Sequence, residues 1–215
     1  GREIDHSHVP EEDVACVYAG FECAVHTAHH PWLTQLSAVN AAEEILSDRA
    51  AIEAVIKQPV RGMAYPFGAV NAQVKDVVRA CGIVYARGTG VTGDTSLPED
   101  AYDWSCSCHH SALESLIEPF LSDDRRLALL SVWGHSYEFD ITETWDEFEE
   151  QLSRLGGKDD VWYATNLEIF DYIEAYGRLR WTAAGDVAEN PTATDLFIEC
   201  DGETVCIPAG ERIEL

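Results

Sequence analysis

The sequence has few positively charged residues and very few lysines. It contains 14 Lys and Arg residues against 39 Asp and Glu, which gives a formal net charge of −25. Binding to nucleic-acid phosphates or to an anionic membrane requires a basic surface, so this balance argues against both partners. A surface rich in carboxylates keeps a protein soluble in concentrated salt. We therefore hypothesise that the protein is adapted to high salt.

The sequence also lacks a long hydrophobic run and an even number of cysteines. No apolar segment approaches the ~20 residues of a transmembrane helix, so no membrane span is predicted. The seven cysteines exclude a complete set of intrachain disulfides. The odd cysteine count and the lack of a visible signal peptide favour a cytoplasmic location, and secretion is the alternative. A length of 215 residues with 46% hydrophobic content indicates a globular domain with a real core.

The spacing of apolar residues predicts alternating helices and strands, as expected of repeated βα units. The predicted strands cover residues 21–25, 60–65, 83–86, 127–133 and 161–164. The predicted helices cover residues 11–18, 36–56, 72–81, 111–121, 144–155 and 166–179. Residues 87–102 lack periodicity and are interpreted as a long loop.

The character of the sequence changes after Arg180. The segments 193–200 and 203–208 are β-rich, and Asp201-Gly202 between them is a strong hairpin signal. We therefore predict an α/β domain over residues 1–181 and a β-rich C-terminal extension over residues 182–215.

Polar and aromatic residues follow several of the predicted strands. They are His26 and His30, the turn at 64–68, the loop ending at Asp100–Trp104, and Gly134-His135. Loops after parallel strands converge at one edge of a sheet, so these groups are expected to share a site. Histidines four residues apart project to one side and can hold a divalent metal; the alternative is an ordinary pair of solvated or packed histidines.

These segments resemble the motifs of the polysaccharide deacetylase (NodB-homology) family. His26-Thr-x-x-His30-Pro is similar to its metal motif, and Ala64-Tyr-Pro-Phe-Gly68 to a groove-wall motif. Asp100-x-x-Asp103-Trp104 is similar to a second wall motif, and LSVWGHS at 130–136 to the final motif. The run WGHSYEF resembles one branch of the family. The resemblance spans about residues 15–180.

The resemblance implies a distorted or incomplete (β/α) barrel that removes N-acetyl or O-acetyl groups from a polysaccharide or amino sugar. His26 and His30 would hold Zn²⁺, or Co, Ni or Mn, and His135 would act as general acid. Substrate contacts would come from a further set: Tyr65, Pro66, Asp103, Trp104 and Trp133. For His135 the alternative is a structural histidine bonded to backbone, and for Trp104 and Trp133 it is simple core packing.

One part of the family pattern has no counterpart in this sequence. The family has an Asp-Asp pair after its first strand, which supplies a base and a metal ligand, and no such strand precedes His26. Three explanations are open. The first βα unit is lacking, another chain supplies the carboxylates, or the site is degenerate. An open sheet edge would then be covered by a rearranged N-terminus or by a partner, for example in a homo-oligomer.

Three other functions remain open. A degenerate site would leave a module that binds a glycan or a metal without turnover. The same fold could hydrolyse another C–N amide bond. Finally, Cys106-Ser-Cys108-His109-His110 contains thiols and imidazoles close enough to ligate a structural zinc, against the simpler interpretation of a loop with partly buried thiols. Glu44 and Asp48 on the 36–56 helix are interpreted as part of its solvated face.

Overall fold

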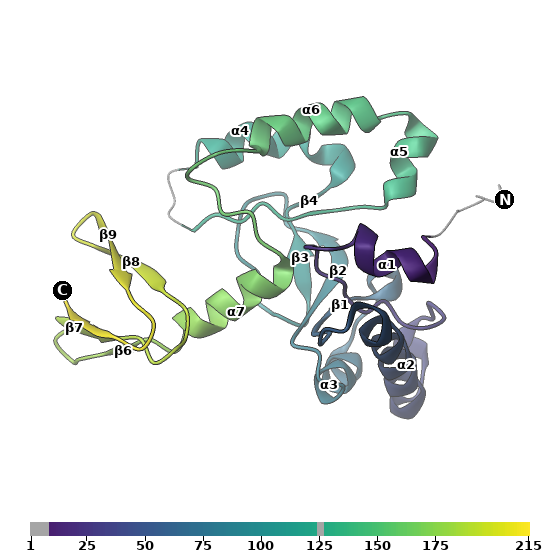
Figure 1. The fold of residues 1–215 in the computed structure, drawn as a ribbon, viewed down its shortest axis with the longest axis horizontal. Helices are drawn as coiled ribbons and strands as arrows, with labels where there is room; N and C mark the ends of the chain where they lie inside the picture. Colours follow the sequence, from purple (N-terminus) through teal and green to yellow (C-terminus); the bar gives the residue numbers. More distant parts are fainter. Residues whose placement is uncertain (1–8, 124–126) are drawn as a thin grey trace. The chain divides into compact units, whose positions relative to one another are not determined.

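A computed structural model describes residues 9–123 and 127–215 of the chain (Figure 1). The chain divides into two compact units, Gly1–Tyr163 and Ala164–Leu215. The boundary expected from the sequence, after residue 181, lies inside the second unit. Each unit is considered by itself below.

Unit 1 alternates helices with short strands. Its helices are α1 (Glu11–Val17), η1 (Leu33–Gln35), α2 (Ala38–Ile56), η2 (Pro66–Gly68), α3 (Ala72–Ala80), η3 (His110–Ala112), α4 (Glu114–Leu121), α5 (Ser136–Thr142) and α6 (Trp145–Leu155). Its strands are β1 (Gly62–Ala64), β2 (Tyr85–Val91), β3 (Trp104–Cys106), β4 (Cys108–His109) and β5 (Val132–Trp133). This is the mixed α/β composition predicted from the sequence.

The strands of unit 1 are parallel but do not form a closed barrel among the described residues. Strand β2 lies between β1 and β3, and a single bridge from Val25 to Met63 extends this sheet on the β1 side. Strand β4 begins two residues after β3 ends and pairs with β5. All of these connections are parallel, so the strand ends, with the loops that follow them, face the same edge.

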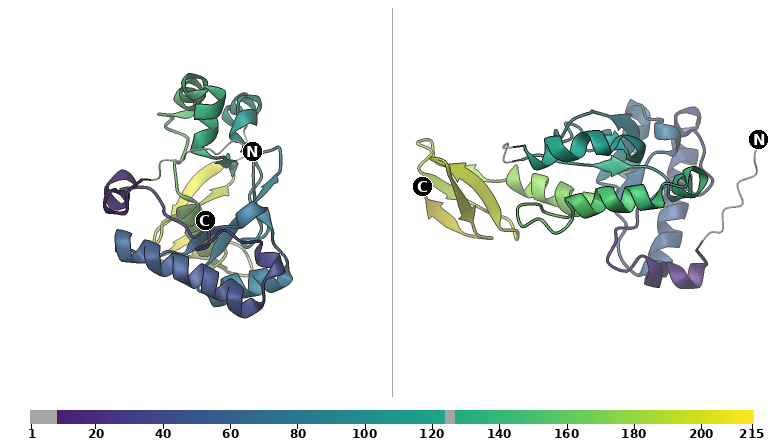
Figure 2. Two further views of the ribbon diagram at one scale, coloured as in Figure 1. Left: turned by 90° about the vertical axis from the view of Figure 1, so that its right-hand side faces the viewer. Right: turned by 90° about the horizontal axis from the view of Figure 1, so that it is seen from above.

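Helices α2 and α3 cover the β1–β2 part of the sheet (Figure 2). Each begins at a residue whose side chain caps it: Ser37 accepts the N–H of Asn40, and Asn71 accepts the N–H of Val74. The core between helices and sheet includes Ile45, which is fully buried. Burying such a side chain contributes roughly 1.5–3 kcal/mol.

A second hydrophobic cluster joins helices α4 and α6 to strand β4. Leu113 and Ile117 are fully buried in it, and Phe148 packs against them. The guanidinium of Arg154 on α6 pairs with Glu114 and Glu118 on α4, at 2.8 and 2.9 Å. The two helices therefore lie side by side, as Figure 2 also shows.

Unit 2 combines one helix with antiparallel strands. Its elements are α7 (Asn166–Tyr176), β6 (Arg180–Trp181), β7 (Val187–Glu189), β8 (Leu196–Cys200), β9 (Glu203–Ile207) and β10 (Arg212–Glu214). Strand β7 lies between β10 and β6, and β8 pairs with β9. The turn between β8 and β9 is Asp201-Gly202, with φ of 50° and 85°, which is the hairpin expected from the sequence.

Several predicted elements are wrong in extent. Residues 21–25 are not a buried strand, because among them only Val25 forms a β-bridge with another described segment, and Phe21 is 73% exposed. Strand β2 runs on into the predicted loop as far as Val91. Its glycines allow this extension because β3 approaches closely: a Cβ at Gly90 would lie 2.9 Å from Ser105 Oγ.

Three further predictions also need correction. The predicted strand 127–133 shortens to β5. Leu127 is 56% exposed, and the N–H of Leu129 donates to the Thr95 carbonyl, which is not part of a strand. Residues 161–164 form no strand, because the Tyr163 hydroxyl instead bonds the backbone near the end of α6. Ser111 does not cap a helix but lies in η3, and helix α5 was not predicted.

Within the described part of the chain, no helix combines the length and the hydrophobicity that crossing a membrane would require.

Candidate functional site

The loop from His26 to His30 brings the two predicted metal-binding imidazoles together. Their ring centroids lie 4.7 Å apart. The loop reverses sharply: Thr27 has a φ of 69°, an uncommon conformation for a β-branched residue, and its hydroxyl accepts the N–H of His30 at 3.1 Å. The spacing therefore does place both histidines on one side, as expected.

One ring nitrogen of His26 is committed to the backbone. Nδ1 lies 2.7 Å from the carbonyl oxygen of Ala64 at the end of β1, so it carries the proton and donates it to that oxygen. The other nitrogen, Nε2, is then unprotonated and available as a ligand. Partial burial lowers the pKa of His26, and the neighbouring His30 and Arg87 lower it further, which keeps the ring neutral.

Helix α2 holds the histidine loop in place. Asp48 accepts a hydrogen bond from the backbone N–H of His26 at 2.7 Å. Glu44 accepts one from the backbone N–H of His29, and its other oxygen lies 2.9 Å from His29 Nδ1. The interpretation of Glu44 and Asp48 as a solvated face is therefore wrong. Periodicity showed which helix face they share but not that a loop folds back onto it.

An aromatic surface adjoins the histidine pair. The ring of Phe67, in the turn after β1, lies 4.5 Å from that of His30 and stacks on Trp32 at 4.3 Å with nearly parallel planes. Trp32 and Phe67 are 46% and 47% exposed. These two rings are thus open to a ligand beside His30.

Tyr65 and Pro66, the other predicted contacts in this turn, are buried. Tyr65 is 1% exposed and donates its hydroxyl to the Tyr102 carbonyl at 2.8 Å. Burial, with the nearby Asp103 and Asp100 carboxylates, raises the pKa of this hydroxyl far above its usual value. The structure favours a packing role for Tyr65 over an open face for a sugar.

Asp103 and Trp104 also have structural partners. Asp103 and Asp100 both bind the ammonium of Lys75, at 2.8 and 2.9 Å. Trp104 is 1% exposed and contacts Tyr85 edge to face. Of the two interpretations of Trp104, core packing fits its burial.

His135 lies at the start of helix α5 in a cluster of three histidines around one carboxylate. Its backbone N–H donates to Glu138 Oε2 at 2.9 Å, and its Nδ1 lies 3.3 Å from the same oxygen. Nε2 of His109 and of His110 lie 3.1 and 3.0 Å from that oxygen. Among the described residues, His109, His110 and Glu138 form the group of three whose ligand atoms are close enough to hold a metal ion, all within 4.8 Å of one another.

The environment of Glu138 favours its charged form. Burial alone would raise its pKa, but the His135 N–H and the side chains of His110 and His135 outweigh that effect and lower the pKa to about 2. A glutamate ionised at all ordinary pH values can therefore orient the imidazoles around it.

Trp133 and Arg87 lie between the two histidine clusters. The Trp133 ring is 4.8 Å from His109 and 5.9 Å from His135. The Arg87 guanidinium lies 5.7 Å from the Trp133 ring and also acts electrostatically on His26. Arg87, on β2, is thus a neighbour of both clusters.

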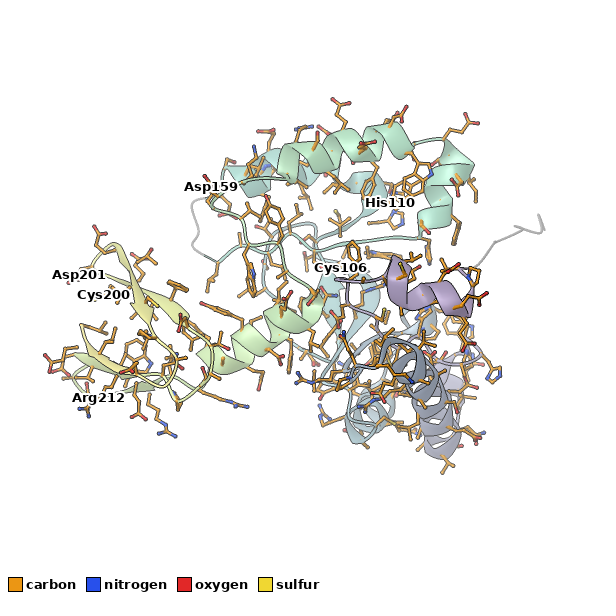
Figure 3. The ribbon with its side chains drawn as sticks, viewed as in Figure 1. Cys106, His110, Asp159, Cys200, Asp201 and Arg212 are labelled. Carbon is orange, nitrogen blue, oxygen red and sulfur yellow. The ribbon has the colours of Figure 1, made fainter. Side chains whose placement is uncertain are left out.

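Sequence reasoning did not identify Arg87 or Glu138 as site residues. Glu138 belongs to the WGHSYEF run, but its partners His109 and His110 lie 29 and 28 residues earlier in the sequence. Only folding brings them together. His109 and His110 were considered with Cys106 and Cys108. Both cysteines are buried and neither belongs to the metal-capable group; Figure 3 labels Cys106 and His110.

These observations define an α/β chain with histidine clusters at the ends of parallel strands. Residues 1–86 match the sequence profile of the family described as Polysaccharide deacetylase. This match includes the His26–His30 motif, so this part of the chain is similar to the family whose motifs the sequence resembles. A comparison with curated proteins finds no significant match.

Three solved structures have a similar fold over part of this chain. A CE4 family pseudoenzyme from Bacillus anthracis is 18% identical, with a TM-score of 0.46 over 72% of this chain and 48% of its own. A family 4 carbohydrate esterase from Streptomyces lividans is 18% identical, with a TM-score of 0.42 over 65% of each chain. A putative polysaccharide deacetylase from Bacillus anthracis is 23% identical, with a TM-score of 0.40 over 47% of this chain and 32% of its own. The chain spans between a third and a half of the length of several of these structures.

Proposed function

We propose that the protein is a metal-dependent deacetylase that removes N-acetyl or O-acetyl groups from a polysaccharide or amino sugar. The observation that carries the proposal is the His26–His30 pair, whose rings lie 4.7 Å apart within the segment that matches the deacetylase family. The exposed histidine at residue 135, on the same unit, supports it.

The histidine pair fits two ligands of a divalent metal. The Nδ1 proton of His26 is held by the Ala64 carbonyl, which leaves Nε2 free and fixes the ring orientation. Zn²⁺ suits imidazole ligands, and Co, Ni or Mn would be alternatives. When bound, the ion would polarise the acetyl carbonyl and acidify a water.

The role proposed for His135 is to donate a proton to the departing amine or hydroxyl. Its Nδ1 lies 3.3 Å from Oε2 of the ionised Glu138, which orients the ring. The side chain is 49% exposed, so a substrate can reach it. Glu138 is then a positioning residue that acts through His135.

Contact with an N-acetylated carbohydrate is proposed for the stacked rings of Trp32 and Phe67, because they are exposed beside His30. Contact by Pro66, Asp103 and Trp133 remains a prediction. For Tyr65 and Trp104, burial favours a role in packing.

The test is acetate release from N-acetylated chito-oligosaccharides and from acetylated xylan by the full chain with added Zn²⁺. His135→Gln is expected to lower the rate by about 10²- to 10⁴-fold, the usual contribution of a general acid. His26→Ala should abolish both zinc-dependent activity and zinc binding at this pair. Glu43→Gln is the control, since Glu43 is exposed and has no proposed role, and should leave the rate unchanged. Activity that survives both His26→Ala and His135→Gln would contradict the proposal.

A second candidate is a non-catalytic module of the same family that binds a glycan or a metal. It is favoured by one observation: among the described residues, no carboxylate joins His26 and His30 in a group of three metal-capable ligands. Oligosaccharide binding without acetate release, with or without zinc, would establish this alternative. Release of ammonia or amine from a non-sugar amide would instead indicate another C–N hydrolase.

A further inference from the structure

Oxygen Oε2 of Glu138, beside His109 and His110, is surrounded by more nitrogen atoms than it can accept hydrogen bonds from. Four nitrogens lie within 3.3 Å of Glu138 Oε2: the backbone N and Nδ1 of His135, and Nε2 of His109 and of His110. A carboxylate oxygen has about two lone-pair sites. Hydrogen bonds alone therefore do not account for all four contacts.

The separations fit ligands around a small cation. A tetrahedral zinc ion with bonds of about 2.0–2.1 Å holds its ligands roughly 3.3 Å apart. Nε2 of His109 and Nε2 of His110 lie 3.1 and 3.0 Å from Glu138 Oε2, and all three ligand atoms lie within 4.8 Å of one another.

The surroundings orient the ligands as they do in metal sites. His109 Nδ1 lies 2.9 Å from the Ser111 hydroxyl and 3.4 Å from the Ser111 backbone nitrogen, so Ser111 fixes the orientation of this ring. The His110 side chain is only 10% exposed and packs against Phe139 and Phe148. Gly134 leaves room for the ring, because a Cβ at that position would collide with it.

We infer that His109 Nε2, His110 Nε2 and Glu138 Oε2 form a binding site for a divalent zinc-type cation, separate from the His26–His30 pair. Two imidazoles and one carboxylate are a donor set that zinc uses, with a fourth position left for water. The ion would tie the β4–η3 segment to the start of α5, 28 residues further along the chain. The inference does not rest on the proposed deacetylase activity, and it replaces the two cysteines of the sequence hypothesis with Glu138.

The test is zinc titration of the chelator-treated full chain by calorimetry, with stoichiometry from elemental analysis. Glu138→Gln, which keeps the shape of the side chain, and His110→Ala are each expected to weaken binding of one zinc equivalent by about 100-fold or more. That exceeds the roughly 10- to 100-fold cost of changing an outer-shell partner. Glu43→Gln, at an exposed position on α2, is the control and should bind as the wild type does. Unchanged affinity and stoichiometry in both site variants would overturn the inference.

Two further measurements separate this site from the proposed active site and from misfolding. In His26→Ala the zinc at His109, His110 and Glu138 should remain even if acetate release is lost. In the His26→Ala variant and in the wild-type chain, added Zn²⁺ should shift the Nε2 nuclear magnetic resonances of His109 and His110. The second measurement needs no substitution in the site, so it decides the question even if His110→Ala fails to fold. Unshifted His109 and His110 resonances would contradict the site.

Discussion

At the level of single residues, the chemistry of both histidine clusters depends on which ring nitrogen has a fixed partner. In His26 the Ala64 carbonyl binds Nδ1, and in His109 the Ser111 hydroxyl does. In His26 this partner leaves Nε2 as the ligand atom, whereas Nε2 of His109 lies 3.1 Å from Glu138 Oε2. In His135 the partner of Nδ1 is the Glu138 carboxylate, at 3.3 Å. Three histidines of one chain thus have different chemistry because of one neighbour each.

The exposed ring of Trp32 provides a test of carbohydrate contact. Trp32→Ala is expected to weaken binding of an N-acetylated chito-oligosaccharide by roughly tenfold, about 1.4 kcal/mol, because part of an aromatic face is lost. The affinity is measured by calorimetry in a His135→Gln background to limit turnover. Trp181→Ala is the matched control, since Trp181 is 49% exposed in unit 2. Equal loss in both variants would argue against a specific role for Trp32.

At the level of elements, the C-terminal half of α2 is tied to its neighbours by one ion pair. Glu53 accepts the N–H of Val60, just before β1, and pairs with Arg49 at 2.9 Å. Arg49 in turn donates to the Cys81 carbonyl at the end of α3. Two side chains thus connect α2 with the ends of a strand and a helix.

These contacts predict a pH dependence of stability. The Val60 N–H and, next, Arg49 lower the pKa of Glu53 below its ordinary value of 4.5. The charged form therefore stabilises the fold above about pH 5, and that contribution is lost as the pH falls through the lowered pKa. Glu53→Gln should reduce the free energy of unfolding at pH 7, and the difference from wild type should shrink towards pH 3.

Urea unfolding at a series of pH values measures this effect. Glu43→Gln, an exposed position on the same helix, is the control and should show little change at any pH. A Glu53→Gln deficit that stayed constant down to pH 3 would show that the lost contribution is not electrostatic.

At the level of the whole molecule, the dominant feature is its charge of −25. Carboxylates that repel one another oppose the compact state, and salt at 1 M shortens the range of this repulsion to about 3 Å. The melting temperature is therefore expected to rise through a series from low to molar KCl. A melting temperature that falls or stays level across the series would contradict adaptation to high salt.

Several elements in both units follow from local sequence signals. Helix α2 was expected from apolar residues at helical spacing and is found within two residues of its predicted ends. The β8–β9 hairpin follows from Asp201-Gly202, since few residue pairs adopt positive φ at both positions. Such features depend on neighbours in the chain, which a sequence displays directly.

Strand lengths were predicted less well because pairing is a long-range property. The apolar run 21–25 has the composition of a strand, yet among these residues only Val25 forms a β-bridge with another described segment. The glycine-rich segment up to Val91 has little strand propensity, yet β3 pairs with it. In both cases the neighbouring strand, and not the residue type, decided the outcome.

The sequence by itself determined the acidic character of the protein, its α/β class and the pairing of His26 with His30, since these depend on composition and on spacings of a few residues. Only the tertiary structure decided that Tyr65 and Trp104 are buried. Only it showed that Glu138 gathers His109, His110 and His135. The contacts of Glu138 with His109 and His110 join residues 29 and 28 apart, and such separations close only when helices and sheet pack on a common core.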